Sequence, residues 1–480
     1  MFMLIPSLLE AKKRSKQEVL TKTDEYIVKE HLKDLGSGKK YYVKTYGCQM
    51  NEHDTENIKA ILEDMSFTEV DSMEEADLIL LNTCAIRENA HNKVFGMIGR
   101  IKHLKETKPS IIAGICGCMA QEEGVVKEIL DKYNWLDIVF GTHNIHNLPN
   151  ILYEAINKND LEIEVLSIEG NIVENIPVKR ESKYKAWVNI MYGCDKFCTY
   201  CIVPYTRGAQ RSRSKESIIN EVINLKNEGY KEVTLLGQNV NAYGKDLYEN
   251  YNLADLLKDV SDTGIDRIRF VTSHPWDFTD EMIEVIKNRD NVMPYVHLPI
   301  QSGSNRILKL MGRRYTKESY LLLYKKLRTI ENVSITTDII VGFPDESEED
   351  FEETINLVNE CKFDGAFTFA YSPRENTPAS IMKGQIDESV KMNRLNRLNE
   401  VVNKYSNINN NKYVGKQVKV LVLGKSEKGK NKVMGYTPQM KLVNVTASED
   451  VIGKIIDVII TDAKSFSLDG ELIEKSKINS

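Results

Sequence analysis

The sequence predicts an α/β protein: an N-terminal parallel α/β domain, a central partial (β/α) barrel and a small C-terminal OB-like β-barrel. Residues 41–142 contain four apolar runs separated by helical patterns, as in a parallel sheet buried on both faces. Six further strand-and-helix units lie between residues 186 and 411, which fits a partial barrel. Residues 412–475 alternate apolar and polar residues between Gly and Asp turns, which predicts a small all-β domain.

Composition narrows the class of protein. The 480 residues are 41% hydrophobic and 28% charged, as in folded globular proteins. No apolar run reaches the ~18 residues of a membrane helix. The N-terminal stretch has its basic residues after the apolar part and no small-residue cleavage site, so we expect neither a membrane anchor nor a signal peptide. We expect a cytoplasmic protein whose eight cysteines are reduced.

The first predicted domain follows a charged extension, residues 1–40, which contains the breaker LGSGKK and is expected to be partly helical and loosely attached. The N-terminal domain is predicted over residues 41–157. Its expected strands are YYVKTYGC (41–48), ADLILLNTC (76–84), PSIIAGICGC (109–118) and DIVFGT (137–142). Apolar residues at helical spacing predict a helix around residues 58–65.

Three of these strands end at a cysteine: Cys48, Cys84 and Cys118. The carboxyl ends of neighbouring parallel strands meet at one edge of a sheet, where ligands bind. Three βα periods could therefore bring three thiols into one crevice. The alternative is that each cysteine is a small buried apolar residue. The polar, turn-prone residues that follow each cysteine favour the crevice.

The central domain is predicted over residues 180–411, after a polar linker at 155–182. Its expected strands are AWVNIM (186–191), EVTLLG (232–237), RIRFVTS (267–273), YVHLPI (295–300), SITTDIIVGF (334–343) and AFTFAYS (366–372). Helical patterns such as residues 214–229 separate these strands.

A second group of cysteines, Cys194, Cys198 and Cys201, follows the first of these strands with C-x3-C-x2-C spacing. Zinc usually takes four ligands, in pairs such as C-x2-C, and no suitable fourth ligand follows closely. Three thiolates in a tight loop suit a 4Fe–4S cluster with one iron left open. An open metal position is where a catalytic site takes its substrate or cofactor.

The two remaining cysteines are predicted to be packing residues. Cys116 lies two positions before Cys118 and could compete as a ligand, although core packing is the default expectation. Cys361 follows an amphipathic helical pattern and is expected in the core.

The C-terminal domain, residues 412–475, is locally basic in a chain whose net charge is −6. It contains eleven lysines and eight acidic residues, and residues 412–432 hold seven lysines against Glu427. A cluster of like-charged residues in a sequence often marks only a solvent-exposed surface. On an OB-like barrel it favours contacts with nucleic-acid phosphates, for which Lys416, Lys428 and Lys430 are candidates.

Several motifs resemble a known family. CDKFCTYC (194–201), with the aromatic Tyr200 before the last cysteine, resembles the radical S-adenosylmethionine enzymes. The methylthiotransferases among them are matched, in order, by TYGCQMNEHDTE (45–56), NTCAIRENA (82–90), GCMAQ (117–121), IVPYTRGAQRSR (202–213), LLGQNVNAY (235–243), HLPIQSGS (297–304) and DIIVGFPDE (338–346). Within that family, RFVTSHPWDF (269–278) resembles the branch that acts on N6-isopentenyladenosine in tRNA.

This resemblance implies a ligand set and a reaction. It implies one 4Fe–4S cluster on Cys48, Cys84 and Cys118, and a second one on Cys194, Cys198 and Cys201 that binds S-adenosylmethionine. It implies a C-terminal TRAM domain that binds RNA. The implied reaction inserts a methylthio group at C2 of the adenine next to the anticodon, after radical abstraction of the C2 hydrogen. That C–H bond has no neighbouring group to stabilise a carbanion, so acid–base catalysis is a poor route.

The resemblance and the strand ends together indicate further site residues. Tyr200 and residues at the carboxyl ends of barrel strands are expected to shape the cofactor pocket. These are Gly237, Gln238, Asn239, Gln301 and Asp338. Arg207, Arg211 and Arg213 follow the cysteine loop and are predicted to hold tRNA phosphates or the carboxylate of S-adenosylmethionine.

The expected partners are a tRNA with N6-isopentenyladenosine and a low-potential electron donor, and the chain is expected to be a monomer. Two alternatives within the family modify threonylcarbamoyl-adenosine in tRNA or a ribosomal protein. A further alternative is an iron–sulfur electron carrier or RNA-binding module without catalysis. In electron carriers each cluster is normally bound by four cysteines. The two groups of three cysteines in this sequence do not fit that pattern.

Overall fold

The computed structural model describes residues 22–85, 88–158, 161–165 and 171–473. The chain forms two compact units. Each unit is built from three segments, and the segments of the two units alternate along the sequence. The first comprises Met1–Glu181, Met191–Arg213 and Arg374–Ser380; the second comprises Ser182–Ile190, Ser214–Pro373 and Ile381–Ser480. Each unit is described by itself below.

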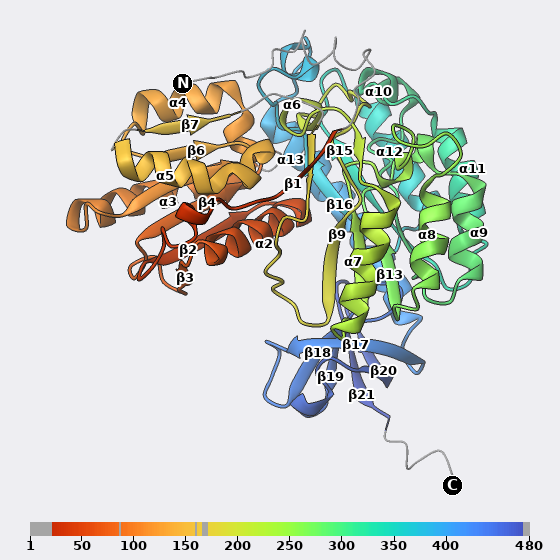
Figure 1. The fold of residues 1–480 in the computed structure, drawn as a ribbon. Helices are drawn as coiled ribbons and strands as arrows, with labels where there is room; N and C mark the ends of the chain where they lie inside the picture. Colours follow the sequence, from red (N-terminus) through yellow and green to blue (C-terminus); the bar gives the residue numbers. More distant parts are fainter. Residues whose placement is uncertain (1–21, 86–87, 159–160, 166–170, 474–480) are drawn as a thin grey trace. The chain divides into compact units, whose positions relative to one another are not determined.

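The first unit contains the predicted parallel sheet (Figure 1). Its six strands lie in the order β3 (Thr68–Glu69), β2 (Lys40–Tyr46), β4 (Leu78–Thr83), β5 (Ile112–Gly117), β6 (Ile138–Phe140) and β7 (Glu162–Glu164). Every pairing in it is parallel. The prediction of a parallel α/β fold is confirmed.

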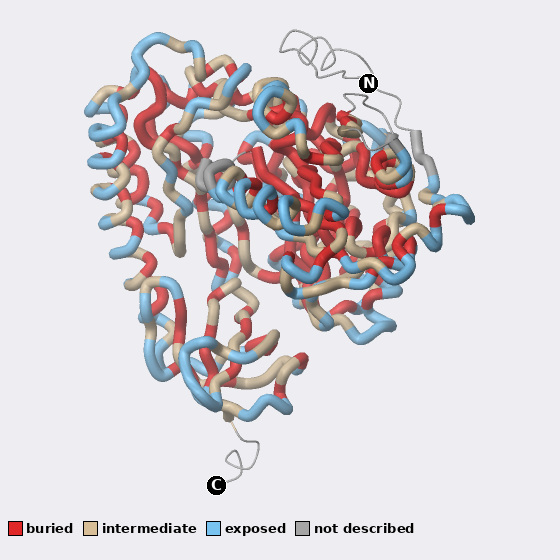
Figure 2. The backbone as a smooth tube through the Cα atoms, turned by 90° about the vertical axis from the view of Figure 1, so that its left-hand side faces the viewer, coloured by how far each residue is buried: buried red, intermediate tan, exposed pale blue. Residues whose placement is uncertain are grey.

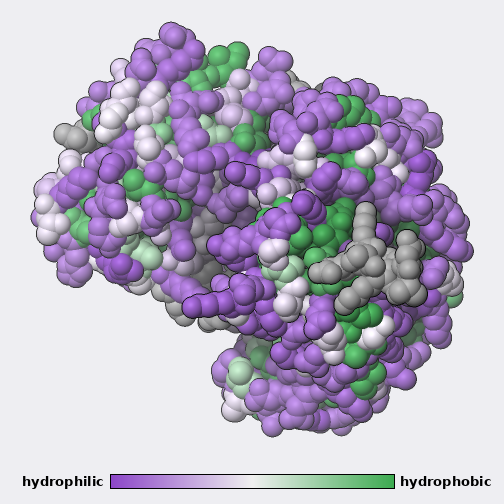
Figure 3. Space-filling view, turned by 90° about the horizontal axis from the view of Figure 1, so that it is seen from below, coloured by the Kyte–Doolittle hydropathy of each residue, from purple (hydrophilic) through white to green (hydrophobic). Residues whose placement is uncertain are grey.

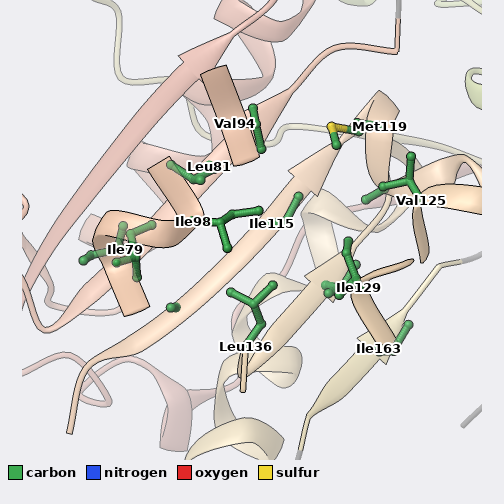
Figure 4. Close-up of a cluster of buried hydrophobic side chains, with 14 of the residues drawn as sticks. Ile79, Leu81, Val94, Ile98, Ile115, Met119, Val125, Ile129, Leu136 and Ile163 are labelled. Carbon is green, nitrogen blue, oxygen red and sulfur yellow. The ribbon is translucent and has the colours of Figure 1, made fainter. Parts of the chain in front are cut away.

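Helices cover both faces of this sheet. Helices α3 (Glu88–Thr107) and α4 (Glu123–Lys132) pack on one face, where Ile98, Ile115 and Ile129 lie together in the core shown in Figure 4. Helices α2 (Gln49–Asp64) and α5 (Leu148–Lys158) pack on the other face. Because both faces are covered, the central strands β4, β5 and β6 are largely buried, whereas β2, β3 and β7 are more exposed. Figure 2 shows the distribution of buried and exposed backbone.

Two segments differ from their expected form. Residues 155–182, expected to be a linker, supply β7 and also β8 (Asn171–Glu174). Strand β8 pairs in parallel with β1 (Lys22–Glu25), in the segment expected to be a partly helical extension. That segment also contains a short 3-10 turn, Glu30–Leu32, whose Leu32 is buried. Residues 1–21 of the extension lie outside the described residues.

The loop that carries the second cysteine group belongs to the first unit. Two short antiparallel strands, β10 (Met191–Tyr192) and β11 (Arg211–Ser212), enclose it. Helix α6 (Val203–Thr206) lies within the loop.

The second unit contains all six predicted barrel strands. They form two parallel three-stranded sheets, β13 (Arg267–Phe270)–β12 (Glu232–Leu236)–β9 (Lys185–Asn189) and β14 (Tyr295–His297)–β15 (Ser334–Val341)–β16 (Gly365–Ala370). A parallel bridge between Ile268 and Val292 lies between β13 and β14. The helices are α7 (Lys215–Asn227), α8 (Leu253–Asp262), α9 (Asp280–Asn288), α10 (Asn305–Leu310), α11 (Lys317–Leu327), α12 (Glu348–Cys361) and α13 (Glu388–Asn411).

The two faces of these strands differ in chemistry. Alternate residues such as Val233, Ile268 and Ile339 are apolar and fully buried. Many of the residues between them on the same strands are polar, charged or aromatic, such as Arg269 and Asp338, although the apolar Leu236 and Ile340 lie on this side too. One face of the sheets is therefore built for packing and the other for polar chemistry.

The C-terminal part of the second unit is a closed barrel, as predicted. Its strands run in the order β17 (Gln417–Lys425), β18 (Lys432–Tyr436), β19 (Leu442–Thr446), β21 (Leu468–Leu472) and β20 (Ile455–Ala463). Valines dominate its core, with Val420, Val433 and Val445 fully buried. Branched side chains suit the interior of so small a barrel.

Two buried arginines on β13 join this barrel to the central strands. Arg267 donates to the carbonyl oxygens of Tyr436 at 2.8 Å and Lys419 at 3.2 Å. Arg269 donates to those of Pro438 and Thr437 at 2.7 and 2.8 Å. Both arginines are almost fully buried beside the Glu232 carboxylate. The attachment is therefore directional and depends on guanidinium groups.

No helix of the described residues is long and apolar enough to span a bilayer. The face shown in Figure 3 is mostly hydrophilic, with hydrophobic side chains in separate patches.

Replacing Arg269 with methionine should loosen the C-terminal barrel. The substitution removes the closer of the two guanidinium groups beside Glu232 and the donor to two buried carbonyl groups, at a cost of about 3–5 kcal/mol. Hydrogen exchange should show faster opening of the amides of β18 and β19. Arg289→Met, which removes the ion pair of a more exposed arginine with Asp262, should cost less than about 1 kcal/mol. Equal effects of the two substitutions would contradict this role of Arg269.

Candidate functional site

The first cysteine group lies where three neighbouring strands end. Cys48 follows β2, Cys84 follows β4 and Cys118 follows β5. The ladder pairs Tyr46 with Thr83 and Thr83 with Gly117, so the three strands end at one level. Cys84 hydrogen bonds to Cys48, and the Sγ atoms of Cys48 and Cys118 lie 3.4 and 4.0 Å from the same Asn51 Oδ1 atom. The three thiols predicted to converge are therefore brought together.

Two buried asparagines fix this arrangement. Asn51 donates to Asn82 Oδ1 at 3.1 Å and to the Thr83 carbonyl at 3.0 Å. Asn82 donates back to the Asn51 carbonyl at 2.8 Å. Gly117 adopts φ +93°, and a Cβ atom there would lie 2.3 Å from Asn82 Oδ1. Only glycine fits the turn that leads β5 into Cys118.

The thiols of this group differ in their electrostatics. The hydrogen bond from Cys84 lowers the pKa of Cys48 to about 5, with Arg207 contributing in the same direction. Burial raises the pKa of Cys118 to about 11, although Arg207 opposes this effect. These surroundings therefore favour the thiolate form of Cys48, which is the form that binds iron.

The second cysteine group is held by backbone contacts of its loop. The Cys194 N–H donates to the Gly208 carbonyl at 3.2 Å, and the Cys201 N–H donates to the Cys198 carbonyl at 2.9 Å. Gly193 adopts φ +73°, and a Cβ atom there would lie 2.0 Å from the Ala209 carbonyl oxygen. Burial raises the pKa of Cys194, with a further rise from the charges of the other two cysteines.

The two cysteine groups adjoin one another within the first unit. Ala85 and Cys118 from the sheet edge pack with Ile202 and Tyr205 from the cysteine loop in one buried cluster. Phe197 packs against this cluster, with its ring edge-on to Tyr205. These apolar side chains exclude water from the region beside the thiols.

Arg207 connects the loop of the second cysteine group to Cys118 of the first group. Its Nε–H donates to Cys118 Sγ at 3.2 Å, and its Nη2 lies 2.5 Å from Asp54 Oδ2. Both charged residues are about 95% buried. Charged groups so deeply buried are expensive unless paired, so this ion pair holds the loop against α2.

Of the three arginines predicted to hold tRNA phosphates or the carboxylate of S-adenosylmethionine, Arg207 and Arg211 are buried. Arg211 donates to the Arg207 carbonyl at 3.1 Å and so supports its backbone. These contacts favour a role for Arg207 and Arg211 inside the site, beside the thiols. The phosphate contact expected for Arg213 stays a prediction, and Tyr200 lies half-buried in the same loop.

Sequence reasoning did not single out Asn51, Asn82 or Asp54. A signal for two of them was present. Asn51 and Asp54 stand three residues apart, at helical spacing, immediately after Cys48, where polar residues on the buried side of a helix need partners.

The donor set fits iron–sulfur clusters. Each group offers three sulfur atoms close together, the ligand type of such clusters. Within the described residues, no three His, Cys, Asp or Glu side chains converge on one point as ligands of a single metal ion. The thiolates that hold a 4Fe–4S cluster lie further apart than the ligands of a single metal ion, because each thiolate binds a different iron.

The residues predicted to shape the cofactor pocket in the second unit lie at strand ends or on the polar face. Gly237, Gln238 and Asn239 follow β12, and Asn239 donates to Asp277 at 2.7 Å. Gln301 adopts φ +74° and bridges to Ile339. Asp338 lies on β15, 3.3 Å from His297 Nε2. Their contacts with S-adenosylmethionine stay predictions.

The other two cysteines are buried. Cys116, two residues before Cys118, packs in the apolar core with Ile138 and Phe140. Cys361 ends α12, and burial raises its pKa to about 12.

A cationic cavity of about 550 Å³ lies in the second unit, where the C-terminal barrel meets α13 and the loops before β15 and β16. The charged residues that line it are Arg328, Lys362, Asp364, Lys412, Lys416 and Lys419. Asp364 is bound to Arg328 at 2.9 Å, which leaves an excess of positive charge. Lys428 and Lys430 lie instead in the exposed turn between β17 and β18.

Comparison with protein families divides the chain into three matched regions. Residues 40–141 match a family described as "Uncharacterized protein family UPF0004". Residues 188–358 match the Radical SAM superfamily, and residues 411–473 match the TRAM domain.

Curated relatives match almost the whole chain. A protein named tRNA-2-methylthio-N(6)-dimethylallyladenosine synthase, from Staphylococcus aureus (strain Newman), is 55% identical over 98% of this chain and 92% of its own length. The protein of the same name from strain JH9 is 54% identical over the same shares.

Among solved structures, the radical S-adenosylmethionine methyltransferase TsrM from Kitasatospora setae has a similar fold. The form with tryptophan and a SAM analog bound has a TM-score of 0.52 at 14% identity, over 72% of this chain and 75% of that one. The form with cobalamin and a [4Fe-4S] cluster bound has a TM-score of 0.51. At this identity the likeness concerns the fold alone.

Removing the Arg207–Asp54 pair should change the properties of a cluster on the first cysteine group. The double variant Arg207→Met/Asp54→Asn avoids leaving one buried charge unpaired. In a background with Cys194, Cys198 and Cys201 changed to alanine, its cluster should have a more negative reduction potential, because an N–H···S hydrogen bond stabilises the reduced cluster. Potentiometry followed by EPR measures this shift.

The control for this experiment is Arg100→Met, which removes an exposed arginine that pairs with Glu74 on the same unit. It should leave the potential unchanged. An identical potential in the double variant and the control would show that Arg207 does not act on the cluster.

Proposed function

The chain belongs to the radical S-adenosylmethionine family of tRNA-2-methylthio-N(6)-dimethylallyladenosine synthases, and from this premise we propose how its residues serve that activity. The enzyme adds a methylthio group to C2 of N6-isopentenyladenosine in tRNA. The observation that carries the proposal is the assembly of two thiol groups, Cys48–Cys84–Cys118 and Cys194–Cys198–Cys201, in one unit.

We propose one 4Fe–4S cluster on each thiol group. Three thiolates bind three irons and leave the fourth iron for a ligand from outside the protein. When bound, the cluster of the second group and S-adenosylmethionine supply the radical chemistry, and the first group holds the cluster that provides sulfur. The protein itself must favour the thiolate form of the cysteines, hold them in position and keep water away from them.

The residues of the first unit fit these tasks. The hydrogen bond from Cys84 favours the thiolate of Cys48, while Arg207 places a permanent positive charge beside Cys118. Phe197, Ile202 and Tyr205 exclude water, which protects reactive intermediates. Asn51 and Asn82 fix the distance between the strand ends. Rigid positioning of this kind is the main contribution a protein makes to cofactor chemistry.

We propose that the cationic cavity takes part in tRNA binding. Positive charges lining a concave surface attract phosphodiester groups, with little preference for sequence. The cavity borders the C-terminal barrel, and it contains Lys416, which was predicted to bind RNA. Lys428 and Lys430, in the exposed turn, would extend the contact along the RNA backbone.

Three further features belong to the proposal. The reaction needs a low-potential electron donor, since cleavage of S-adenosylmethionine consumes an electron from the reduced cluster. We place the reaction in the cytoplasm, where tRNA is found. We propose a monomer, which light scattering of the reconstituted protein tests.

The assignment of the second cysteine group predicts the behaviour of Cys198→Ala. With a reductant, S-adenosylmethionine and a prenylated anticodon stem-loop, the wild-type protein should form 5′-deoxyadenosine and the methylthio nucleoside. Cys198→Ala should form neither product, because the cluster loses one of its three ligands. Cys116→Ala, a packing cysteine, is the matched control and should keep both products. Mass spectrometry of the nucleosides gives the result, and cleavage by Cys198→Ala would refute the assignment.

The cationic cavity predicts a charge-dependent loss of tRNA affinity. Lys412→Glu/Lys416→Glu should weaken binding and reduce the slope of log affinity against log salt by about two, one per lost phosphate contact. The control is Lys287→Glu/Lys309→Glu, which makes the same charge change on two exposed positions of α9 and α10. Equal losses in the two double variants would indicate a general charge effect and argue against the cavity.

A further inference from the structure

Two exposed aromatic rings lie side by side on the polar face of the second unit. Phe367 and Phe369 on β16 are 58% and 47% exposed. The opposite face of β16 is covered by α13, where Thr368 hydrogen bonds to Asn399 at 2.5 Å. Because alternate residues of a strand point to opposite faces, both rings turn away from the helix.

The neighbours of these rings combine apolar and hydrogen-bonding groups. The ladder places Phe367 beside Asp338 and Phe369 beside Ile340 on β15. The ring of His297 lies edge-on to Phe367, with 5.8 Å between the centroids, and its Nε2 lies 3.3 Å from Asp338 Oδ2. Two apolar rings thus border a half-buried pair of polar side chains.

This arrangement matches a purine that carries an apolar substituent. Aromatic side chains stack on any base, and the added alkenyl chain offers apolar surface for a second ring. A single exposed apolar residue needs no explanation, but two adjacent rings on the functional face of a sheet do.

We propose that Phe367 and Phe369 hold the dimethylallyl-adenine of the substrate and set the preference for a prenylated over an unmodified adenine. This inference rests on the proposed function. Its position fits the reaction, since Asp338 is predicted to contact S-adenosylmethionine and the base must lie next to that reagent. The adenine of S-adenosylmethionine itself is a poorer match, because it carries no apolar chain for the second ring.

The test compares two anticodon stem-loops, one with N6-isopentenyladenosine and one with unmodified adenosine, on the reconstituted holoenzyme. The variants are Phe367→Ala, Phe369→Ala and the double variant. Each single change should lower kcat/KM for the prenylated RNA at least about tenfold, chiefly through KM, as expected for lost apolar contacts. Affinity for the unmodified RNA should change less, so the wild-type preference should shrink. Phe367→Leu should recover part of the loss.

The control is Leu322→Ala, which removes a similarly exposed apolar side chain from α11 and should leave both RNAs unaffected. Because the two rings are exposed, their removal opens no buried cavity and the variants should fold. An unchanged preference in the double variant would overturn the inference. An increased KM for S-adenosylmethionine alone would overturn it too, by assigning the rings to the cofactor. Wild-type protein that forms no methylthio product would refute the proposed function instead.

Discussion

The arrangement of the cysteine site depends on one buried cation. Three thiols meet at the sheet edge in surroundings that disfavour negative charge, and thiolates are needed there to bind iron. The guanidinium of Arg207 supplies positive charge through its contact with Cys118, and Asp54 holds it in place. Because Arg207 belongs to the loop of Cys194, Cys198 and Cys201, the same ion pair fixes both cysteine groups in one unit.

The chain separates its tasks between surfaces. The carboxyl edge of the parallel sheet presents thiols, since strands β2, β4 and β5 end at one level. The strands of the second unit bury one apolar face, and most of the polar and aromatic groups lie on the other. Arg267 and Arg269 then attach the C-terminal barrel, and the cationic cavity lies at this junction. The proposed cluster chemistry, base recognition and RNA contact thus rest on different parts of the structure.

Much of this could be predicted from the sequence. Unbroken apolar runs predicted the parallel sheet. Three of these runs end at Cys48, Cys84 and Cys118, which predicted that the three thiols lie close together, because the carboxyl ends of neighbouring parallel strands meet at one edge of a sheet. The burial of Arg207 could not be predicted, since its partner Asp54 lies 153 residues away. The sequence AFTFAYS suggested a strand but not which face is covered, because the covering helix α13 follows later in the chain. The strands β1, β7 and β8 were missed because they are short and polar.

The claim that two clusters share one chain has a direct measurement: iron and acid-labile sulfide per chain after anaerobic reconstitution. The wild-type protein should contain about eight of each, and the variant with Cys48, Cys84 and Cys118 changed to alanine about four. About four of each in the wild-type protein, or an undiminished content in that variant, would contradict the account.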